Sequence, residues 1–82
     1  MDPRELAREA IPYLRQAFGE ECQILLRLQS TEEGPLYKMT VHLLPQYDRN
    51  PDQALRQFEE TWWLDNCHRS EGNLVFDYEK SA

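Results

Sequence analysis

The first eighteen residues carry apolar side chains at the spacing of an amphipathic helix. Every fourth position from Leu6 onward is apolar: Leu6, Ala10, Leu14 and Phe18. This period places those side chains on one helix face. Pro3 suits the first helical position, and Gly19 stands where a left-handed residue ends many helices. We therefore predict a helix over residues 3–18, which Pro12 either kinks or splits in two.

Two runs of alternating apolar and polar positions follow, separated by a turn. Within residues 22–30 and within residues 37–44, apolar side chains recur at every second position. This is the period of a half-buried strand. Residues 31–35 between them are rich in turn-forming types. We predict a hairpin over residues 22–44. Its side chains buried under the helices should include Ile24, Leu26, Met39 and Val41.

A second helix and a last strand complete the pattern. Asn50-Pro51 repeats a helix-start signal, and an apolar stripe follows at Leu55, Phe58 and Trp62. We predict that this helix stops near residue 64, before a polar run. Residues 74–79 alternate as a strand. A tail over residues 79–82 is expected to fray.

The element order α-β-β-α-β predicts one α+β domain spanning residues 1–82. Each helix has a single apolar stripe, so we expect both to pack on one face of a three-stranded, mainly antiparallel sheet. The strand–helix–strand unit should cross over right-handedly, which makes the last strand parallel to the second. We expect this last strand to lie against the free edge of the first.

Charge and composition restrict the classes of partner. The chain has 15 Asp and Glu against 9 Lys and Arg, a net charge of −6. We therefore expect no binding to nucleic acid or to anionic membranes, which both need basic surfaces. No stretch approaches the roughly 20 apolar residues of a membrane span, and the first residues do not resemble a signal peptide. A cytoplasmic protein with free thiols at Cys22 and Cys67 is expected.

The most chemically versatile segment follows the second helix. Successive helical residues differ by about 100° in direction, so Trp62 and Trp63 cannot both be core. The phase relative to Leu55 assigns Trp62 to the core and leaves Trp63 near solvent. Six residues are the candidates for partner binding: Glu59, Glu60, Trp63, Asp65, His68 and Arg69. Acidic side chains beside an exposed indole favour a basic protein as the partner.

Cys67 and His68 support an alternative, a small thiol-dependent enzyme or redox protein. A nucleophilic cysteine needs a third, orienting group and an oxyanion hole. Asp65 or Glu60 could orient the imidazole, but no motif supplies the hole. Zinc would need two further ligands. We therefore expect no catalytic residue, metal or cofactor, with Cys67 partly buried in a loop and His68 solvated.

The sheet face turned away from the helices is the second candidate surface. Its outward positions include Leu25, Leu44 and Val75 among polar side chains. Apolar residues on an open, three-stranded sheet with exposed edges favour pairing between copies. A homodimer through this open face is therefore the alternative to a basic partner.

Two resemblances extend this interpretation. The element order resembles a ferredoxin-like fold lacking its first strand, and also class II KH and BolA-like domains. No Gly-x-x-Gly loop or basic groove accompanies it, so RNA binding is not implied. The Asn-Cys-His-Arg-Ser segment after Trp-Trp, with the closing Leu-Val-Phe-Asp-Tyr-Glu, is similar to small uncharacterised proteins of cyanobacteria, which implies no activity. The sequence favours a small cytosolic protein-interaction or regulatory module without catalytic activity.

Overall fold

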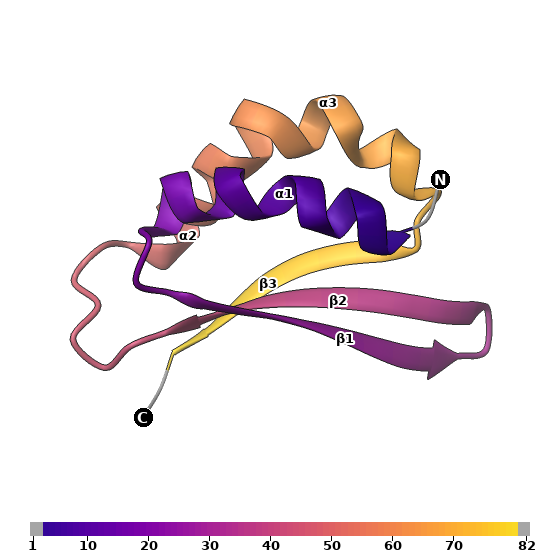
Figure 1. The fold of residues 1–82 in the computed structure, drawn as a ribbon, viewed down its shortest axis with the longest axis horizontal. Coiled ribbons are helices and arrows are strands. Elements are labelled where there is room, and N and C mark those ends of the chain that lie inside the picture. Colours follow the sequence, from indigo (N-terminus) through magenta and orange to yellow (C-terminus); the bar gives the residue numbers. More distant parts are fainter. Residues whose placement is uncertain (1–2, 81–82) are drawn as a thin grey trace.

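The computed structural model describes residues 3–80, which form a helical layer on one face of a sheet (Figure 1). The strands are β1 (Gln23–Thr31), β2 (Gly34–Leu43) and β3 (Leu74–Lys80). The helical segments are α1 (Pro3–Phe18), α2 (Pro51–Phe58), the π-helical turn η1 (Glu59–Trp63), α3 (Leu64–Asn66) and the 3₁₀ turn η2 (Cys67–Ser70). The predicted α+β class and order of elements are confirmed.

Pro12 does not divide α1. The helix is continuous from Pro3 to Phe18, and Pro12 lies on its exposed side, away from the core contacts that a kink would disturb. Gly19 ends the helix with φ 110°, and its N–H donates to the Arg15 carbonyl at 2.8 Å. The predicted glycine stop is therefore confirmed.

The sheet is mixed, with β2 at its centre. The hairpin pairs β1 with β2 from Gln23–His42 to Thr31–Gly34, and β3 runs parallel to β2 as predicted. The expectation that β3 lies against β1 is wrong, because the strand order is β1-β2-β3. β2 is the strand with most buried side chains, including Met39, Val41 and Leu43. Its central position gives it a neighbouring strand on each edge.

The second helical segment is longer than predicted. Asn50 caps α2 by accepting hydrogen bonds from the N–H groups of Asp52 and Gln53, which confirms the predicted start. The helix does not stop near residue 64 but continues to Ser70. Its polar residues bond the helix's own carbonyls: the Asn66 amide donates to the Trp62 carbonyl at 2.8 Å. Such local bonds satisfy groups that a helix end leaves unpaired.

The C-terminal strand also exceeds its predicted length. β3 runs to Lys80, so residues 79 and 80 belong to the sheet and not to the frayed tail expected over 79–82. Residues 81 and 82 lie outside the described part of the chain. Within residues 3–80, no helix combines the length and the apolar character needed to cross a membrane.

The helical layer leaves β1 largely uncovered. Met39 and Val41 are buried as predicted, but Ile24 is only half-buried and Leu26 is 38 % exposed. The prediction of a buried Leu26 is therefore wrong. α1 packs against α2 and over β2, whereas Figure 1 shows the hairpin end of β1 diverging from the helices. The twist of the sheet carries this edge strand away from the core.

Candidate functional site

The residues predicted to bind a partner lie on a continuous helical segment. Glu59, Glu60 and Trp63 belong to η1, Asp65 to α3, and His68 and Arg69 to η2. The acidic residues therefore do not lie at the end of their helix, as a stop near residue 64 would have placed them. Along an α-helix, side chains four positions apart differ in direction by about 40°. The wider π turn reduces this difference. Ala54, Phe58 and Trp62 consequently stay on one buried line.

The two tryptophans differ in burial as predicted. Trp62 is 7 % exposed and stacks on Tyr13 of α1, with ring centroids 5.4 Å apart. Trp63 is half-buried and meets Phe76 of β3 edge-on, with centroids 4.6 Å apart. Because one side of its indole already packs on the sheet, Trp63 offers less free surface than an exposed hot-spot residue would.

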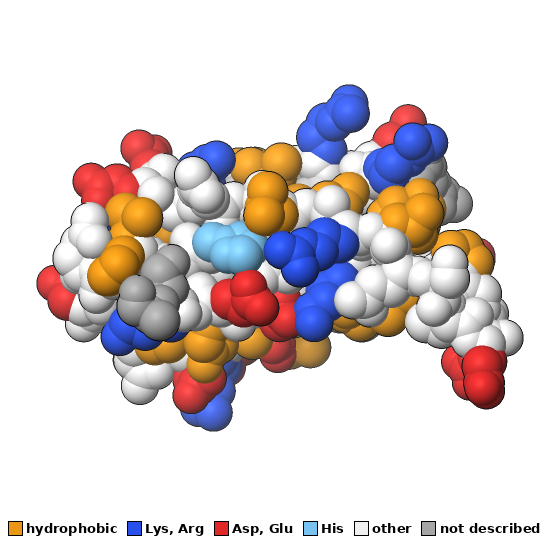
Figure 2. Space-filling view, turned by 90° about the horizontal axis from the view of Figure 1, so that it is seen from below, with side chains coloured by type: hydrophobic (Ala, Val, Ile, Leu, Met, Phe, Trp, Pro, Cys, Tyr) orange, Lys and Arg blue, Asp and Glu red, His pale blue; other side chains and the backbone are white. Residues whose placement is uncertain are grey.

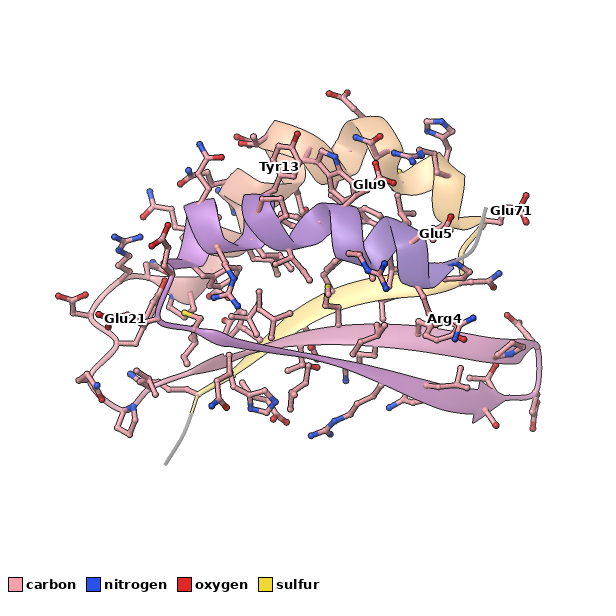
Figure 3. The ribbon with its side chains drawn as sticks, in the orientation of Figure 1. Arg4, Glu5, Glu9, Tyr13, Glu21 and Glu71 are labelled. Atoms are coloured by element: carbon pink, nitrogen blue, oxygen red, sulfur yellow. The ribbon has the colours of Figure 1, made fainter. Side chains whose placement is uncertain are left out.

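The Arg69 side chain forms hydrogen bonds within the fold. Its Nη2 donates to Glu9 Oε2 at 2.7 Å and its Nη1 donates to Asn66 Oδ1 at 3.0 Å. Figure 3 shows Glu9 and Tyr13 pointing from α1 towards the C-terminal helical segment. Arg69 thus ties η2 to α1. The more solvent-accessible members of the predicted site are Glu60, Asp65 and His68, with Glu59 half-buried.

Cys67 and His68 occupy η2, and both are exposed. The prediction of a partly buried Cys67 is wrong, and that of a solvated His68 is confirmed. The Cys67 thiol donates to the Leu64 carbonyl at 3.7 Å, a contact that does not activate a nucleophile. Within residues 3–80, no group of three or more His, Cys, Asp and Glu side chains could hold a metal ion.

The open face of the sheet carries charge in its middle. Lys38 pairs with Asp77 at 2.9 Å, and His42 Nδ1 lies 3.6 Å from Glu79. Figure 2 shows this face from below, with acidic and basic side chains gathered centrally and hydrophobic ones around them. Leu25 and Val75 are 44 % and 39 % exposed. Intervening ion pairs separate these apolar side chains, which weakens the case for an apolar contact over the whole face.

β1 has an apolar stripe that the sequence pattern alone assigned to the core. The register places Ile24, Leu26 and Leu28 opposite Val41, Met39 and Tyr37, on the helix side of the sheet. No helical element makes substantial contact with β1, and the exposed fraction rises to 59 % at Leu28. This surface was missed because the two-residue period reports the shared face of a strand, whereas coverage of that face depends on tertiary structure.

The same three residues point their backbone groups away from the sheet. The Tyr37 N–H donates to the Asn73 carbonyl at 2.8 Å, so the backbone of Tyr37 faces β3. Its partner Leu28 therefore sits at a non-hydrogen-bonded position of the hairpin. By alternation, Ile24, Leu26 and Leu28 all direct N–H and C=O groups to the outer edge of β1. An apolar stripe and an unpaired edge coincide on one strand.

A cavity of about 450 Å³ lies between the loop that joins α1 to β1 and the loop that joins β2 to α2. Cys22 and Tyr47 line it, and the Tyr47 hydroxyl is buried without a hydrogen-bond partner among the described residues. Burial raises the pKa of the Cys22 thiol, although Arg15 and Arg49 nearby act in the opposite direction. Burial likewise raises the pKa of Tyr47. Acidic and basic groups both surround this cavity, so its charges do not define one class of ligand.

Comparison with protein-family models, with curated proteins and with solved structures finds no match to this chain. The resemblance to small cyanobacterial proteins therefore stays a prediction. The surfaces themselves, and above all the edge of β1, are the basis for assigning a function.

Proposed function

We propose that this chain is a small protein-interaction module without catalytic activity, and that β1 is its docking strand. The observation that carries the proposal is the coincidence on β1 of exposed apolar side chains with outward-facing backbone groups. Strand addition uses both features: main-chain hydrogen bonds supply affinity, and alternate side chains supply specificity.

The energetics favour β1 over the other surfaces. Natural proteins shorten, charge or cover an edge strand because an unpaired edge invites association. β1 is nine residues long, and Leu26 and Leu28 stay exposed beside its free edge. Covering these two leucines stabilises a complex by about 25 cal/mol for each Å² of apolar area that is removed from water. On the C-terminal helical segment, by contrast, Trp63 and Arg69 already contact other parts of the fold.

The acidic helical surface supports the same function in a secondary way. Glu60, Asp65 and His68 remain solvent-exposed, and they form the part of the predicted site that a basic partner could reach. The two free thiols fit a reducing compartment such as the cytoplasm, which is the location we propose.

Affinity capture from the source cell with a matched pair of variants tests this proposal. Leu26→Lys and Val75→Lys alter residues of nearly equal exposure, 38 % and 39 %, on the β1 edge and on the open face. A partner retained by the wild type and by Val75→Lys but lost by Leu26→Lys supports docking at β1. If every captured protein is retained by Leu26→Lys, β1 is not the docking strand.

Hydrogen exchange supplies a second readout. In the free chain, the amides of Leu25 and Arg27 bond β2, whereas those of Leu26 and Leu28 face outward and should exchange fast. A bound partner strand should slow exchange at Leu26 and Leu28 and leave Leu25 and Arg27 nearly unchanged. Slowing confined to η1 and α3 would instead place the interface on the acidic helical surface.

A further inference from the structure

We propose that the partner of β1 is a second copy of the chain. This inference rests on the proposed function, because it assigns an occupant to the same strand. The two copies of β1 pair antiparallel about a twofold axis that passes through Leu26, and the two sheets become one six-stranded sheet. A twofold interface requires a surface that is complementary to itself.

The backbone of β1 restricts the possible registers. Only residues with outward-facing N–H and C=O groups can form hydrogen-bonded pairs across the new edge. With Leu26 on the axis, Leu26 faces Leu26 of the second copy, and Ile24 faces Leu28. These three pairs would supply about six backbone hydrogen bonds, two for each pair. They also bring the exposed stripes of both copies together on the helix side of the sheet.

Charge disfavours one of the neighbouring registers. Arg27 is the single charged residue of β1. With Leu26 on the axis, Arg27 lies opposite Leu25 of the second copy. A shift that places Arg27 on the axis would set two guanidinium groups directly opposite each other, which destabilises a strand pair.

The charge of the whole chain also favours β1 as the meeting point. Two copies of net charge −6 repel each other. β1 contains no Asp or Glu, so no carboxylate lies on the paired strands themselves. The preferred partner is therefore a surface that is apolar and free of acidic residues, as the same strand of a second copy is.

Arg15 supplies a charge-complementary contact at each end of the strand pair. Its Nη1 donates to the carbonyls of Glu20 and Cys22, at 2.8 Å and 3.2 Å, which holds the guanidinium beside the start of β1. In the proposed register the hairpin turn of the second copy lies at this end. Glu32 of that turn then approaches Arg15, and this attraction offsets part of the repulsion from Glu20 and Glu21.

Solution mass measured by light scattering tests the assembly. We expect the wild type to reach twice the 9.8 kDa of one chain as its concentration rises to about 0.5 mM, since small interfaces give weak affinities. Leu26→Lys places two ammonium groups at the axis and should leave a monomer. Val75→Lys, the matched control on the open face, should still dimerise. Circular dichroism establishes that both variants are folded.

Cysteine cross-linking tests the register independently. In a Cys67→Ser background, Leu26→Cys places two thiols at a hydrogen-bonded pair with Cα atoms about 5.5 Å apart, within disulfide range. Diamide, which accepts the two electrons and two protons of the thiol pair, should convert this variant to a covalent dimer. Ile24→Cys is the control, because its two copies lie about 14 Å apart in this register and should not cross-link.

The possible outcomes separate this inference from the function on which it rests. A wild type that stays monomeric at about 0.5 mM overturns the second-copy assignment. If β1 then captures a different protein in a Leu26-dependent way, the docking function stands, and without such capture both proposals fail. A dimer that survives Leu26→Lys but dissociates in Val75→Lys also overturns the inference, in favour of pairing through the open sheet face. Cross-linking of Ile24→Cys equal to that of Leu26→Cys overturns the register.

Discussion

Arg69 and Glu9 lie sixty positions apart in the sequence and join through a 2.7 Å bond between Nη2 and Oε2. This pair connects η2 with α1. Its side chains are 25 % and 49 % exposed, so water screens much of their attraction. The pair explains why a residue expected to bind a partner contributes to the fold instead.

A double-mutant cycle should measure this contact. We expect a coupling free energy of about 0.5–1 kcal/mol between Arg69→Gln and Glu9→Gln, because exposed ion pairs seldom contribute more. Urea unfolding of the two single variants and the double variant gives the value. If the two single effects simply add, the pair does not stabilise the fold.

The tryptophans should differ in their contribution to stability. Trp62→Ala should lower the free energy of unfolding by about 3–5 kcal/mol, because it empties a site packed against Tyr13 and Phe58. Trp63→Ala should cost about 1–3 kcal/mol, from the lost contact with Phe76. Urea unfolding measures both changes, and Trp62→Phe serves if the alanine variant does not fold. A larger cost at Trp63 would contradict the helical phase through η1.

Leu26 and Met39 stand opposite each other in the hairpin but should respond differently to truncation. Met39 is 3 % exposed, and Met39→Ala should cost about 2–5 kcal/mol. Leu26→Ala should cost about 1 kcal/mol, since water already reaches the side chain. Urea midpoints at low micromolar protein, where self-association contributes little, give the comparison. Equal costs would mean that Leu26 is covered within a single chain.

Much of the fold follows from local patterns, and what does not follow is tertiary. Gly19 and Asn50 act on neighbouring backbone groups, so the stop and the start that they control were predictable. The neighbour of β3 depends instead on whether β3 pairs with the free edge of β2 or with the free edge of β1. Leu26 shows the same limit, because its two-residue period is identical whether or not a helix covers it.

The candidate site was predictable to a smaller extent. Trp62 and Trp63 could be separated because helical phase is a local property. The polar run after residue 64 resembled a loop, since the bond from Asn66 to the Trp62 carbonyl is not encoded in composition. The pairing of Arg69 with Glu9 joins two segments whose approach no local pattern reports.

Tyr78 and Asp52 should give the protein an alkaline limit of stability. The Tyr78 hydroxyl donates to Asp52 Oδ1, and this bond, which the phenolate form cannot make, raises the pKa of Tyr78 above its ordinary value of 10.0. The contribution is complete below pH 10 and is lost as the pH rises through the higher, folded-state pKa. Unfolding free energies from pH 8 upward should therefore decline more steeply for the wild type than for Tyr78→Phe. Identical slopes would show that the bond does not form in solution.

The two thiols should react at different rates. Cys67 is exposed, whereas Cys22 is buried, its Sγ lies 3.5 Å from the Phe18 carbonyl, and burial raises its pKa. A chromogenic disulfide at pH 8 should modify Cys67 quickly and Cys22 slowly, after local opening. Cys67→Ser should remove the fast phase. A fast phase that persists in this variant would place Cys22 at the surface.

The free edge of β1 also bears on the tendency of the chain to form fibrils. Ile24, Leu25, Leu26 and Leu28 make up the kind of short apolar strand that stacks into cross-β aggregates. In a parallel, in-register stack every Arg27 would lie about 4.8 Å from the next one, and the repulsion would accumulate with each added chain. In an antiparallel pair about Leu26 that repulsion does not arise. Arg27 therefore favours the proposed closed pair over open-ended growth, and Arg27→Leu should give aggregates that bind amyloid dyes.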